Sequence, residues 1–275
     1  MSVSSIAELA PAKVNLSLHV TGRRADGYHL LDSLVAFADF GDAVTVSLAP
    51  RSQLVVHGPE ERGVPIDQTN SILRAAALAG VTVSVDLTKE LPSAAGIGGG
   101  SSDAAAVLRA ISRLTGAPLL AQAERLGADV PVCLYGRAVR MQGIGENLTP
   151  AALPALPAVL VNPRREVSTP LAFKGLRRAD NPPMPDLPDM PTVETCLRFL
   201  SLQRNDLEPM ARAIEPEIDR VLLAIAQHPE TRLARMSGSG ATCFGLFETR
   251  EAAERAATAL RAEHSGWWVR ATVLR

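Results

Sequence analysis

The sequence predicts an α+β protein of two domains. At 275 residues the chain exceeds the roughly 100–150 residues that are usual for one domain. Its first third is rich in strand-like runs. The part after residue 156 follows the order strand, helices, strand, strand, helix, strand, which resembles a decorated ferredoxin-like split βαβ unit. A change of composition near residues 148–157 marks the boundary, so we expect domains at residues 1–152 and 153–275.

Strand patterns dominate the N-terminal part. Residues 13–20 alternate strictly between polar and apolar side chains, which predicts a half-buried strand whose polar face points towards water. Further strands are predicted at residues 33–39, 43–48, 53–57 and 81–87, with a helix at residues 70–79. Helical spacing then predicts helices at residues 101–114, with Gly116 as C-cap, and at residues 119–126.

The C-terminal part begins with a predicted strand at residues 157–162. Five prolines within ten residues from Pro182 predict a loop at residues 180–191. Helices are predicted at residues 169–176, 192–200, 216–228 and 250–264, and strands flank the SGSG turn at residues 237–240 and end the chain.

Composition excludes several classes of protein. The net charge of −1 and the 4% of aromatic residues do not suit nucleic-acid binding. No apolar run approaches the ~20 residues that span a bilayer, and the N-terminus does not resemble an export signal. The three cysteines are far apart, which indicates reduced thiols rather than disulfides or a zinc site. We therefore expect a cytoplasmic protein that binds small molecules, not nucleic acid or membranes.

The stretch LPSAAGIGGGSS, residues 91–102, places four glycines in five positions directly before a predicted helix. Closely spaced backbone N–H groups at the positive end of a helix dipole form a phosphate site. A flexible connector with a serine N-cap is the alternative. No lysine lies between Glu90 and Arg109, which excludes a Walker A loop, and Ser101 stands where a dinucleotide-binding loop needs glycine. The protein-kinase motifs are also absent.

Three motifs in this order resemble the family of galactokinase, homoserine, mevalonate and phosphomevalonate kinases. They are PAKVNLSLHVTGRRADGYHLLDS near the N-terminus, the glycine-rich stretch, and MSGSGATCFG near the C-terminus. The resemblance implies an N-terminal ribosomal-S5-like α/β domain with the ATP site, a C-terminal ferredoxin-like domain, and a cleft between them. It also implies ATP and Mg²⁺ as cofactors.

RADGYH and GADVPVCLYG are similar to the members of this family that act on a cytidine diphosphate compound. The resemblance implies phosphorylation of the 2-hydroxyl of a methylerythritol group joined to cytidine diphosphate, in the non-mevalonate synthesis of isoprenoid precursors. The loop that would bind ATP consists of Pro92, Ser93, Ala94, Ala95, Gly96, Ile97, Gly98, Gly99, Gly100, Ser101 and Ser102.

The resemblance assigns catalytic roles to Lys13 and Asp129, which on their own would be interpreted as a solvated lysine and a turn aspartate. It likewise places the cytosine between Tyr28 and Phe173, with His29 reading the base edge; otherwise these are a loop aromatic and an apolar anchor. Asn15 is expected to contact the substrate. Asp103 is expected to be structural, favoured in the first turn of its helix by the dipole.

Two alternatives stay open at this point. One is a kinase of the same family that acts on homoserine or a mevalonate derivative and needs no cytosine pocket. The other is a non-catalytic nucleotide-binding module, which has no reason to keep both Lys13 and Asp129. We expect a monomer or a weak homodimer, and the sequence does not say whether residues 180–191 close over the substrate.

Overall fold

The structure is a computed structural model that describes residues 4–118 and 123–275. The described residues form two compact units that are interleaved along the chain. The first unit comprises the described residues of Met1–Lys13, Phe40–Ser93 and Gly98–Gly136, and the second comprises Val14–Asp39, Ala94–Ile97 and Arg137–Arg275. Because this grouping is not a single cut of the chain, the boundary after residue 152 stays a prediction.

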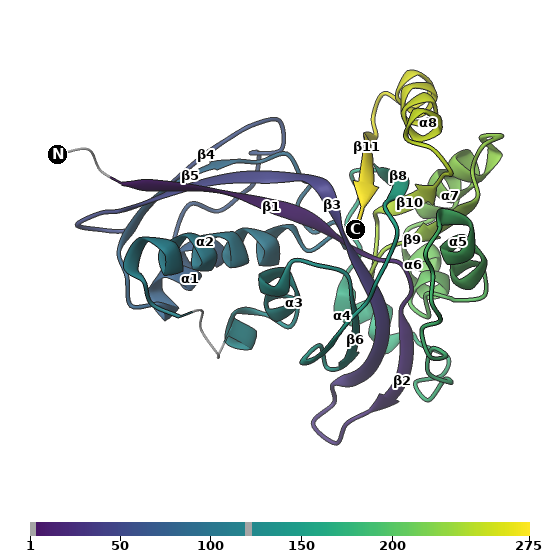
Figure 1. Cartoon of the computed structure of the whole chain (residues 1–275), viewed down its shortest axis with the longest axis horizontal. Helices are drawn as coiled ribbons and strands as arrows, with labels where there is room; N and C mark the ends of the chain where they lie inside the picture. Colours follow the sequence, from purple (N-terminus) through teal and green to yellow (C-terminus); the bar gives the residue numbers. More distant parts are fainter. Residues whose placement is uncertain (1–3, 119–122) are drawn as a thin grey trace. The chain divides into compact units, whose positions relative to one another are not determined.

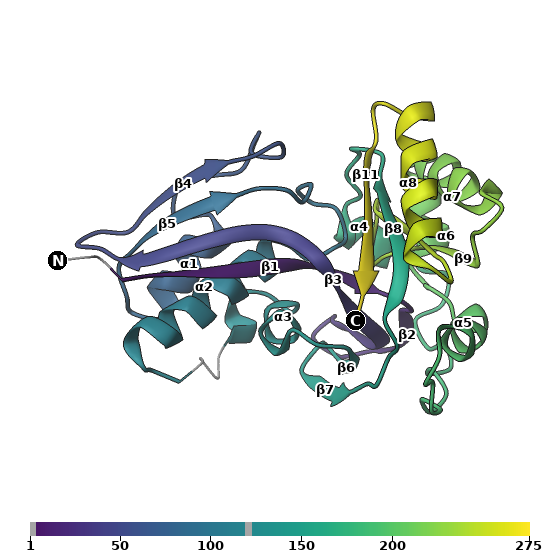
Figure 2. The ribbon, with the colours of Figure 1, turned by 45° about the horizontal axis from the view of Figure 1, so that its top comes forward.

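The first unit is a sheet with helices along one face. Strand β1 (Ser5–Asn15) pairs with β3 (His29–Leu48), β3 lies antiparallel to β5 (Val83–Thr88), and β4 (Gln53–His57) lies parallel to β5. Figures 1 and 2 show α1 (Ser71–Leu78) and α2 (Gly99–Thr115) side by side along one face of these strands. A 3₁₀ turn (Ala123–Leu126) and α3 (Val130–Tyr135) complete the unit.

Local signals explain why α1 and α2 form where the sequence predicts them. The side chain of Asn70 caps α1 by accepting a hydrogen bond from the N–H of Ile72 at 2.8 Å. Helix α2 ends at Gly116, whose φ of +72° lies in the left-handed region, and its N–H bonds the carbonyl of Ser112. The predicted helices at residues 70–79 and 101–114 and the predicted C-cap are therefore confirmed.

The second unit contains the predicted ferredoxin-like sheet. Strands β8 (Leu156–Asn162), β9 (Leu233–Met236), β10 (Cys243–Leu246) and β11 (Trp268–Leu274) are antiparallel in the order β11-β8-β10-β9. The first strand thus lies between the last and the third, as the two interleaved halves of a split βαβ unit require. The unit also contains β2 (His19–Arg23), β6 (Val139–Gly143) and β7 (Asn147–Pro150), with β2 and β6 both paired to β3.

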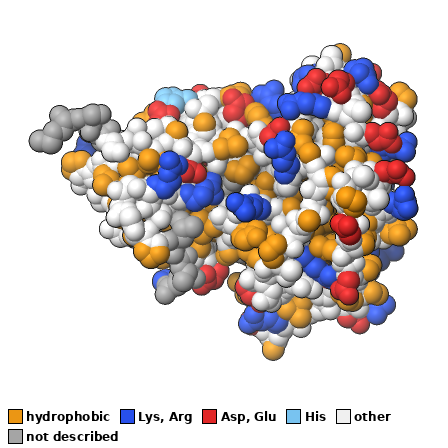
Figure 3. All heavy atoms as spheres, in the orientation of Figure 1, with side chains coloured by type: hydrophobic (Ala, Val, Ile, Leu, Met, Phe, Trp, Pro, Cys, Tyr) orange, Lys and Arg blue, Asp and Glu red, His pale blue; other side chains and the backbone are white. Residues whose placement is uncertain are grey.

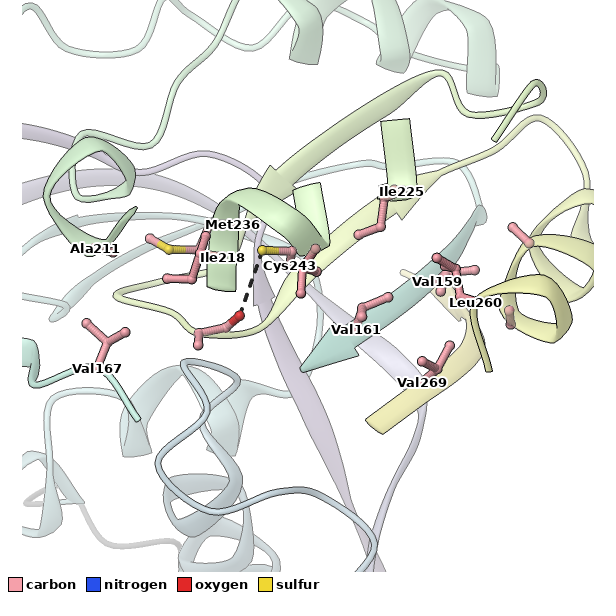
Figure 4. Packing of buried hydrophobic residues seen from close by; sticks show 14 of the residues in the cluster. Val159, Val161, Val167, Ala211, Ile218, Ile225, Met236, Cys243, Leu260 and Val269 are labelled. Atoms are coloured by element: carbon pink, nitrogen blue, oxygen red, sulfur yellow. Dashed lines mark hydrogen bonds between the residues drawn. The ribbon is translucent and has the colours of Figure 1, made fainter. Parts of the chain in front are cut away.

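Five helices accompany this second unit: α4 (Thr169–Lys174), α5 (Val193–Ser201), α6 (Glu208–Ile214), α7 (Glu217–Gln227) and α8 (Arg250–Glu263). Figure 2 shows α7 and α8 on the same side of the strands β8 to β11. The buried face of α8 is made of alanines and Leu260 at helical spacing, which lets the helix lie close to the sheet. Figure 4 shows Val159, Val161 and Val269 from the sheet with Ile218 and Ile225 from α7 in one apolar cluster.

Some expectations need correction. The predicted strand at residues 13–20 is interrupted at residues 16–18, and its polar face is buried, because Lys13, Asn15, Ser17 and His19 are each at most 3% exposed. The two strands predicted at 33–39 and 43–48 are one strand, β3. Residues 119–122 of a predicted helix lie outside the described residues. The prediction missed β6, β7, α3 and α6, which are short and carry proline or weak periodicity.

Surface and thiol chemistry agree with the composition. Cys133, Cys196 and Cys243 are all buried free thiols, as predicted, and burial raises the pKa of Cys133 to about 12. Figure 3 shows charged side chains of both signs mixed over one face of the molecule. Within residues 4–118 and 123–275, no helix is long and apolar enough to cross a membrane.

Candidate active site

Lys13 and Asp129 form an ion pair in the first unit. The Lys13 Nζ lies 2.8 Å from Asp129 Oδ2, and the lysine side chain is 4% exposed while the aspartate is 36% exposed. Asp129 precedes α3 at the N-cap position, but its side chain makes no capping hydrogen bond. The carboxylate therefore serves the lysine and not its own turn, which argues against a turn aspartate. One carboxylate oxygen is left for a further partner at a partly open position.

The start of α2 lies against the same lysine. Its N-cap is Gly98, which has a φ of +66° and offers no side chain to the first turn. The N–H groups of Gly99, Gly100 and Ser101 therefore have no acceptor inside the helix. A Cβ at Gly98 would lie 3.2 Å from the Lys13 Cβ, so glycine permits both the backbone conformation and the close approach of the lysine. These donors and the nearby ammonium favour a bound anion.

A second, fully buried lysine lies behind the glycines. The Lys89 Nζ donates to Asp42 at 2.5 Å and to Asp103 at 2.9 Å, and all three side chains are at most 5% exposed. The other oxygen of Asp42 accepts the N–H groups of Glu90 and Leu91. A Cβ at Gly99 would lie 3.3 Å from the Lys89 Nζ. This cluster joins the segment that precedes the glycine-rich loop to the helix that follows it.

The two carboxylates of this cluster accept different numbers of hydrogen bonds. Asp42 accepts three hydrogen bonds, whereas Asp103 accepts one from Lys89 and its Oδ1 is buried without a partner. Burial raises the pKa of Asp103 to about 7, with the charge of Lys89 opposing the rise and that of Asp42 adding to it. Burial lowers the pKa of Lys89, but the two carboxylates outweigh burial and raise it. Lys89 therefore stays charged.

Asp103 was expected to be favoured by the helix dipole in the first turn of its helix, and this reason for its structural role was wrong. The helix begins at Gly99, and no acidic residue stands in its first turn. Asp103 is structural, as predicted, but through a buried ion pair and not through the helix dipole. Sequence reasoning missed Lys89 and Asp42, because a lysine and an aspartate 47 positions apart carry no local pattern.

The middle of the glycine-rich loop, Ala94–Ile97, belongs to the second unit, where it meets the SGSG turn. Thr242 N–H donates to the Ala95 carbonyl at 3.1 Å, and the Ser237 hydroxyl donates to the Gly96 carbonyl at 3.1 Å. A Cβ at Gly96 would lie 2.6 Å from the Gly240 carbonyl oxygen, closer than real Cβ atoms come. Glycine is therefore required at position 96 by the approach of another backbone.

Asn15 is tied to the same turn. Its backbone N–H donates to the Ser237 hydroxyl at 3.1 Å, and its Nδ2 donates to the Ser33 hydroxyl at 2.8 Å. Its Oδ1 is buried and has no hydrogen-bond partner among the described residues. A buried acceptor without a donor costs free energy unless a ligand supplies one. Asn15 is thus oriented by the protein with one oxygen still to be satisfied.

The residues expected at the cytosine lie on β3, its preceding turn, and α4. Tyr28 is 61% exposed, and its N–H is held by Asp26 at 3.2 Å. The rings of His29 and Phe173 are stacked with centroids 4.8 Å apart. Burial and the charge of Arg23 lower the pKa of His29, so the ring is neutral at pH 7 and offers one donor and one acceptor.

The proline-rich segment at residues 180–191 is irregular, as predicted, and it is held firmly. Arg140 forms a two-pronged ion pair with Asp32, at 2.8 and 2.7 Å, and donates to the Met184 carbonyl at 2.5 Å. Met184 N–H donates back to Asp32 at 3.0 Å, and the Met184 side chain is 2% exposed. The middle of the segment is therefore fastened to β3 and β6.

The structure thus brings together Lys13 with Asp129, Asn15 with the SGSG turn, and His29 with Phe173. The roles of all these residues, and of Pro92–Ser102 and Tyr28, stay predictions. Within the loop, Ala94 adopts a φ of +49°, a left-handed conformation that favours glycine. Among residues 4–118 and 123–275, no three His, Cys, Asp or Glu side chains are grouped to hold a metal ion.

Comparison with known proteins agrees with this picture. The family model of the GHMP kinases N terminal domain matches residues 68–137, and that of the GHMP kinases C terminal matches residues 183–266. A protein of Dinoroseobacter shibae named 4-diphosphocytidyl-2-C-methyl-D-erythritol kinase is 59% identical over 98% of this chain and 95% of its own length. A protein of Cereibacter sphaeroides with the same name is 58% identical over 94% of this chain and 96% of its own length.

Solved structures show the same relationship. A crystal structure of 4-(cytidine 5'-diphospho)-2C-methyl-D-erythritol kinase is 39% identical, with a TM-score of 0.80 over 98% of this chain and 99% of its own. A homoserine kinase from Cytophaga hutchinsonii has a TM-score of 0.68 at 21% identity, over 99% of this chain and 95% of its own, and shares the fold. On its motifs, its two matched domains and these relatives, the chain belongs to the GHMP kinase family of ATP-dependent small-molecule kinases.

Proposed function

We propose that this chain transfers the γ-phosphoryl group of ATP to the 2-hydroxyl of 4-diphosphocytidyl-2-C-methyl-D-erythritol, in non-mevalonate isoprenoid precursor synthesis. The observation that carries the proposal is the Lys13–Asp129 ion pair against the uncapped start of α2. An ammonium, a carboxylate with one oxygen to spare and a row of backbone donors are the groups that phosphoryl transfer to an alcohol requires. The names of the most similar relatives support the choice of substrate.

Each group has a part in this chemistry. Phosphoryl transfer passes through a loose transition state with charge on the equatorial oxygens, so the protein contributes mainly positions and charges. Backbone N–H groups of the glycine-rich loop hold the triphosphate. Lys13 stabilises the negative charge that develops during transfer. Asp129 orients the acceptor hydroxyl and accepts its proton as the new P–O bond forms.

The fixed geometry of Lys13 suits this part. The aliphatic part of its side chain packs against Gly98, so the ammonium group is held in place at the start of α2. Because the lysine side chain is 4% exposed, its charge is poorly screened by water. Asp129 is the more open partner, which leaves its second oxygen accessible to a hydroxyl.

The second unit supplies the groups for the acceptor substrate. The unsatisfied Oδ1 of Asn15 can accept a hydrogen bond from a substrate hydroxyl. The exposed ring of Tyr28 and the ring of Phe173 can stack on cytosine, and a neutral His29 can read its polar edge. Since His29 already stacks on Phe173, we expect the cytosine ring to rearrange or replace that contact.

Mg²⁺ is proposed to enter with ATP as the MgATP complex. Magnesium usually keeps several waters and binds through substrate phosphates with one or two carboxylates, not through an all-protein cage. Asp103, which follows the loop in the sequence, is buried and paired with Lys89. Asp103 is therefore not expected to bind the magnesium ion.

The two alternatives make different demands on the chain. A homoserine or mevalonate-type kinase would share the ATP site but has no use for an exposed tyrosine beside a stacked His29–Phe173 pair. A non-catalytic module would have no use for the Lys13–Asp129 pair. We also propose that the protein works in the cytoplasm as a monomer or a weak homodimer.

The experiment compares Asp129→Asn with Asp86→Asn in a coupled assay with ATP and the cytidine diphosphate substrate. Asp86 lies in the same unit but is exposed and paired only with His57 among the contacts described. Asp129→Asn is expected to lower kcat by ~10²–10⁴-fold with little change in KM for ATP, whereas Asp86→Asn stays near wild type. A folded Asp129→Asn variant with near-normal kcat would refute the role of Asp129.

A thermal-shift measurement separates the substrate classes. CMP or CDP should raise the unfolding temperature, because a ligand that binds only the folded state stabilises it by mass action. Protection by homoserine or mevalonate, with no effect of cytidine nucleotides, would favour the alternative kinases.

A further inference from the structure

We propose that Asn205 is a positioning residue, which sets the place of the Ser237 hydroxyl and through it the places of Asn15 and of the glycine-rich loop. The inference rests on the proposed function only for the identity of the ligands, which are the acceptor substrate at Asn15 and ATP at the loop. All the contacts that carry it lie within the second unit. No motif of the sequence singles out Asn205, which stands between α5 and α6.

The first step is that Asn205 spans the SGSG turn. Its Nδ2 donates to the Met236 carbonyl at 2.9 Å and to the Gly238 carbonyl at 2.8 Å, the two carbonyls on either side of Ser237. Its Oδ1 accepts the N–H of Leu207 at 3.0 Å. Asn205 is 6% exposed, so every polar atom of its side chain is used by the protein.

The second step is that Asn205 is itself held rigidly. Leu18 and Asn205 form a parallel β-bridge, in which Leu18 N–H donates to the Arg204 carbonyl and Asp206 N–H donates to the Leu18 carbonyl. The side chain is therefore presented from a backbone paired with the segment that follows Asn15. Because both its backbone and its side chain are held, Asn205 can fix the position of the SGSG turn that it contacts.

The third step is a second anchor directly before the turn. Arg235 is 7% exposed and donates to the carbonyls of Leu16, Leu200 and Gln203, at 2.7 to 2.9 Å. Below the turn, Figure 4 shows Met236 beside Ile218, and a Cβ at Gly240 would lie 2.7 Å from the Met236 sulfur. Arg235 thus holds the start of the turn and Met236 packs beneath it, while Asn205 holds the part that carries the Ser237 hydroxyl.

The fourth step links this turn to the expected binding groups. The Ser237 hydroxyl accepts the N–H of Asn15 and donates to the carbonyl of Gly96, each at 3.1 Å. Gly96 and Gly238 also approach so closely that a Cβ at Gly238 would lie 2.9 Å from the Gly96 carbonyl oxygen. A shift of the turn must therefore shift both Asn15 and the loop. Misplacement by ~1 Å can cost about 100-fold in rate.

The test pairs Asn205→Ala with Asn181→Ala. Asn181 also donates its Nδ2 to two backbone carbonyls in this unit, those of Val20 and Arg178, and to Asp206 Oδ2 at 3.2 Å, but it does not contact the SGSG turn. We expect Asn205→Ala to weaken the binding of a non-hydrolysable ATP analogue about tenfold and to lower kcat/KM by about 10- to 100-fold. Asn181→Ala should lower thermal stability without changing either constant.

A double-mutant cycle with Ser237→Ala tests the route. If Asn205 acts through Ser237, the losses in ATP-analogue affinity will be far from additive. Should Asn205→Ala fail to fold, Ser237→Ala alone must show the loss of ATP-analogue affinity. Folded Asn205→Ala or Ser237→Ala with wild-type affinity and kcat/KM overturns the inference. A wild-type protein that binds the analogue but does not phosphorylate the cytidine compound overturns the proposed function instead.

Discussion

Replacing Asp103 by Asn should stabilise the protein above neutral pH. In the wild type, Asp103 and Asp42 share the single ammonium of Lys89, and the Asp103 Oδ1 has no donor. Burial raises the pKa of Asp103 from 3.8 to about 7. A raised pKa means that the folded state favours the protonated acid, so this contribution to stability is fully present below about pH 4 and is lost as the pH rises through about 7.

The magnitude follows from the size of the shift. Roughly three pKa units correspond to about 4 kcal/mol between the two ends of this range, as an upper figure for a buried group. An amide in place of the carboxyl resembles the protonated acid and can still accept from Lys89. Asp103→Asn should therefore match the wild type within about 1 kcal/mol near pH 4 and exceed its stability by roughly 1–4 kcal/mol near pH 8.

Urea unfolding at several pH values between about 4 and 8 measures this difference. Asp39→Asn is the matched control, because burial of Asp39 is outweighed by hydrogen bonds from Thr272 and Val273 and by the charge of Arg250, which together lower its pKa. Its stabilising contribution is present at neutral pH and lost on acidification, so this variant should be less stable than wild type near pH 8. An Asp103→Asn variant that is less stable than wild type over the whole range would refute the reasoning.

Three further changes are informative. Ala94→Gly should leave the free energy of unfolding in urea unchanged or raise it by up to about 1 kcal/mol, because it relieves a left-handed alanine. Ala95→Gly, at a buried position, should lower the free energy of unfolding by about 1 kcal/mol or more. The opposite order of the two variants would contradict the loop geometry. Arg140→Met should cost about 3–5 kcal/mol by the same measurement, since it leaves the buried Asp32 without its ion pair, and a loss under about 1 kcal/mol would contradict the clamp on residues 180–191. Tyr28→Ala should raise KM for the cytidine substrate about 10- to 100-fold in steady-state kinetics with an unchanged KM for ATP, and an unchanged KM for both would remove Tyr28 from the pocket.

Local patterns predicted much of the fold. The helix at residues 70–79 was predicted, and the structure adds Asn70 as its N-cap; the helix that ends at Gly116 was predicted from helical spacing and its C-cap. The order of strands and helices after residue 156 predicted a ferredoxin-like unit, and the observed strand order β11-β8-β10-β9 agrees with it. Short elements such as α3, with Pro131 near its start, carry too few residues for a periodicity to emerge.

Burial of polar side chains was the main failure of sequence reasoning. Strict alternation at residues 13–20 indicates a strand with one wet face, yet the polar face is buried, and three of its four members have partners in the interior. Lys13 pairs with Asp129, while Asn15 and Ser17 bond Ser237, Ser33 and Leu34. Such partners lie up to 222 positions away and leave no pattern in a local window.

The candidate site likewise contains residues that motifs predicted and residues that only the structure reveals. Motifs predicted Lys13, Asp129 and the glycine-rich loop, and the structure adds the reason for Gly96 and Gly98. It also adds groups that no motif contains. The Lys89 cluster and Asn205 hold the predicted elements in place through buried contacts, which depend on the whole fold and not on neighbouring residues.

The most direct test of the account is the identity of the reaction product. The wild-type protein is incubated with MgATP and 4-diphosphocytidyl-2-C-methyl-D-erythritol, and the products are followed by phosphorus NMR and mass spectrometry. We expect one ADP for each substrate consumed and a new phosphomonoester at the 2-hydroxyl, with none formed by Asp129→Asn on the same timescale. A folded wild-type protein that binds ATP but leaves this substrate unmodified, or that phosphorylates homoserine or mevalonate instead, would contradict the account.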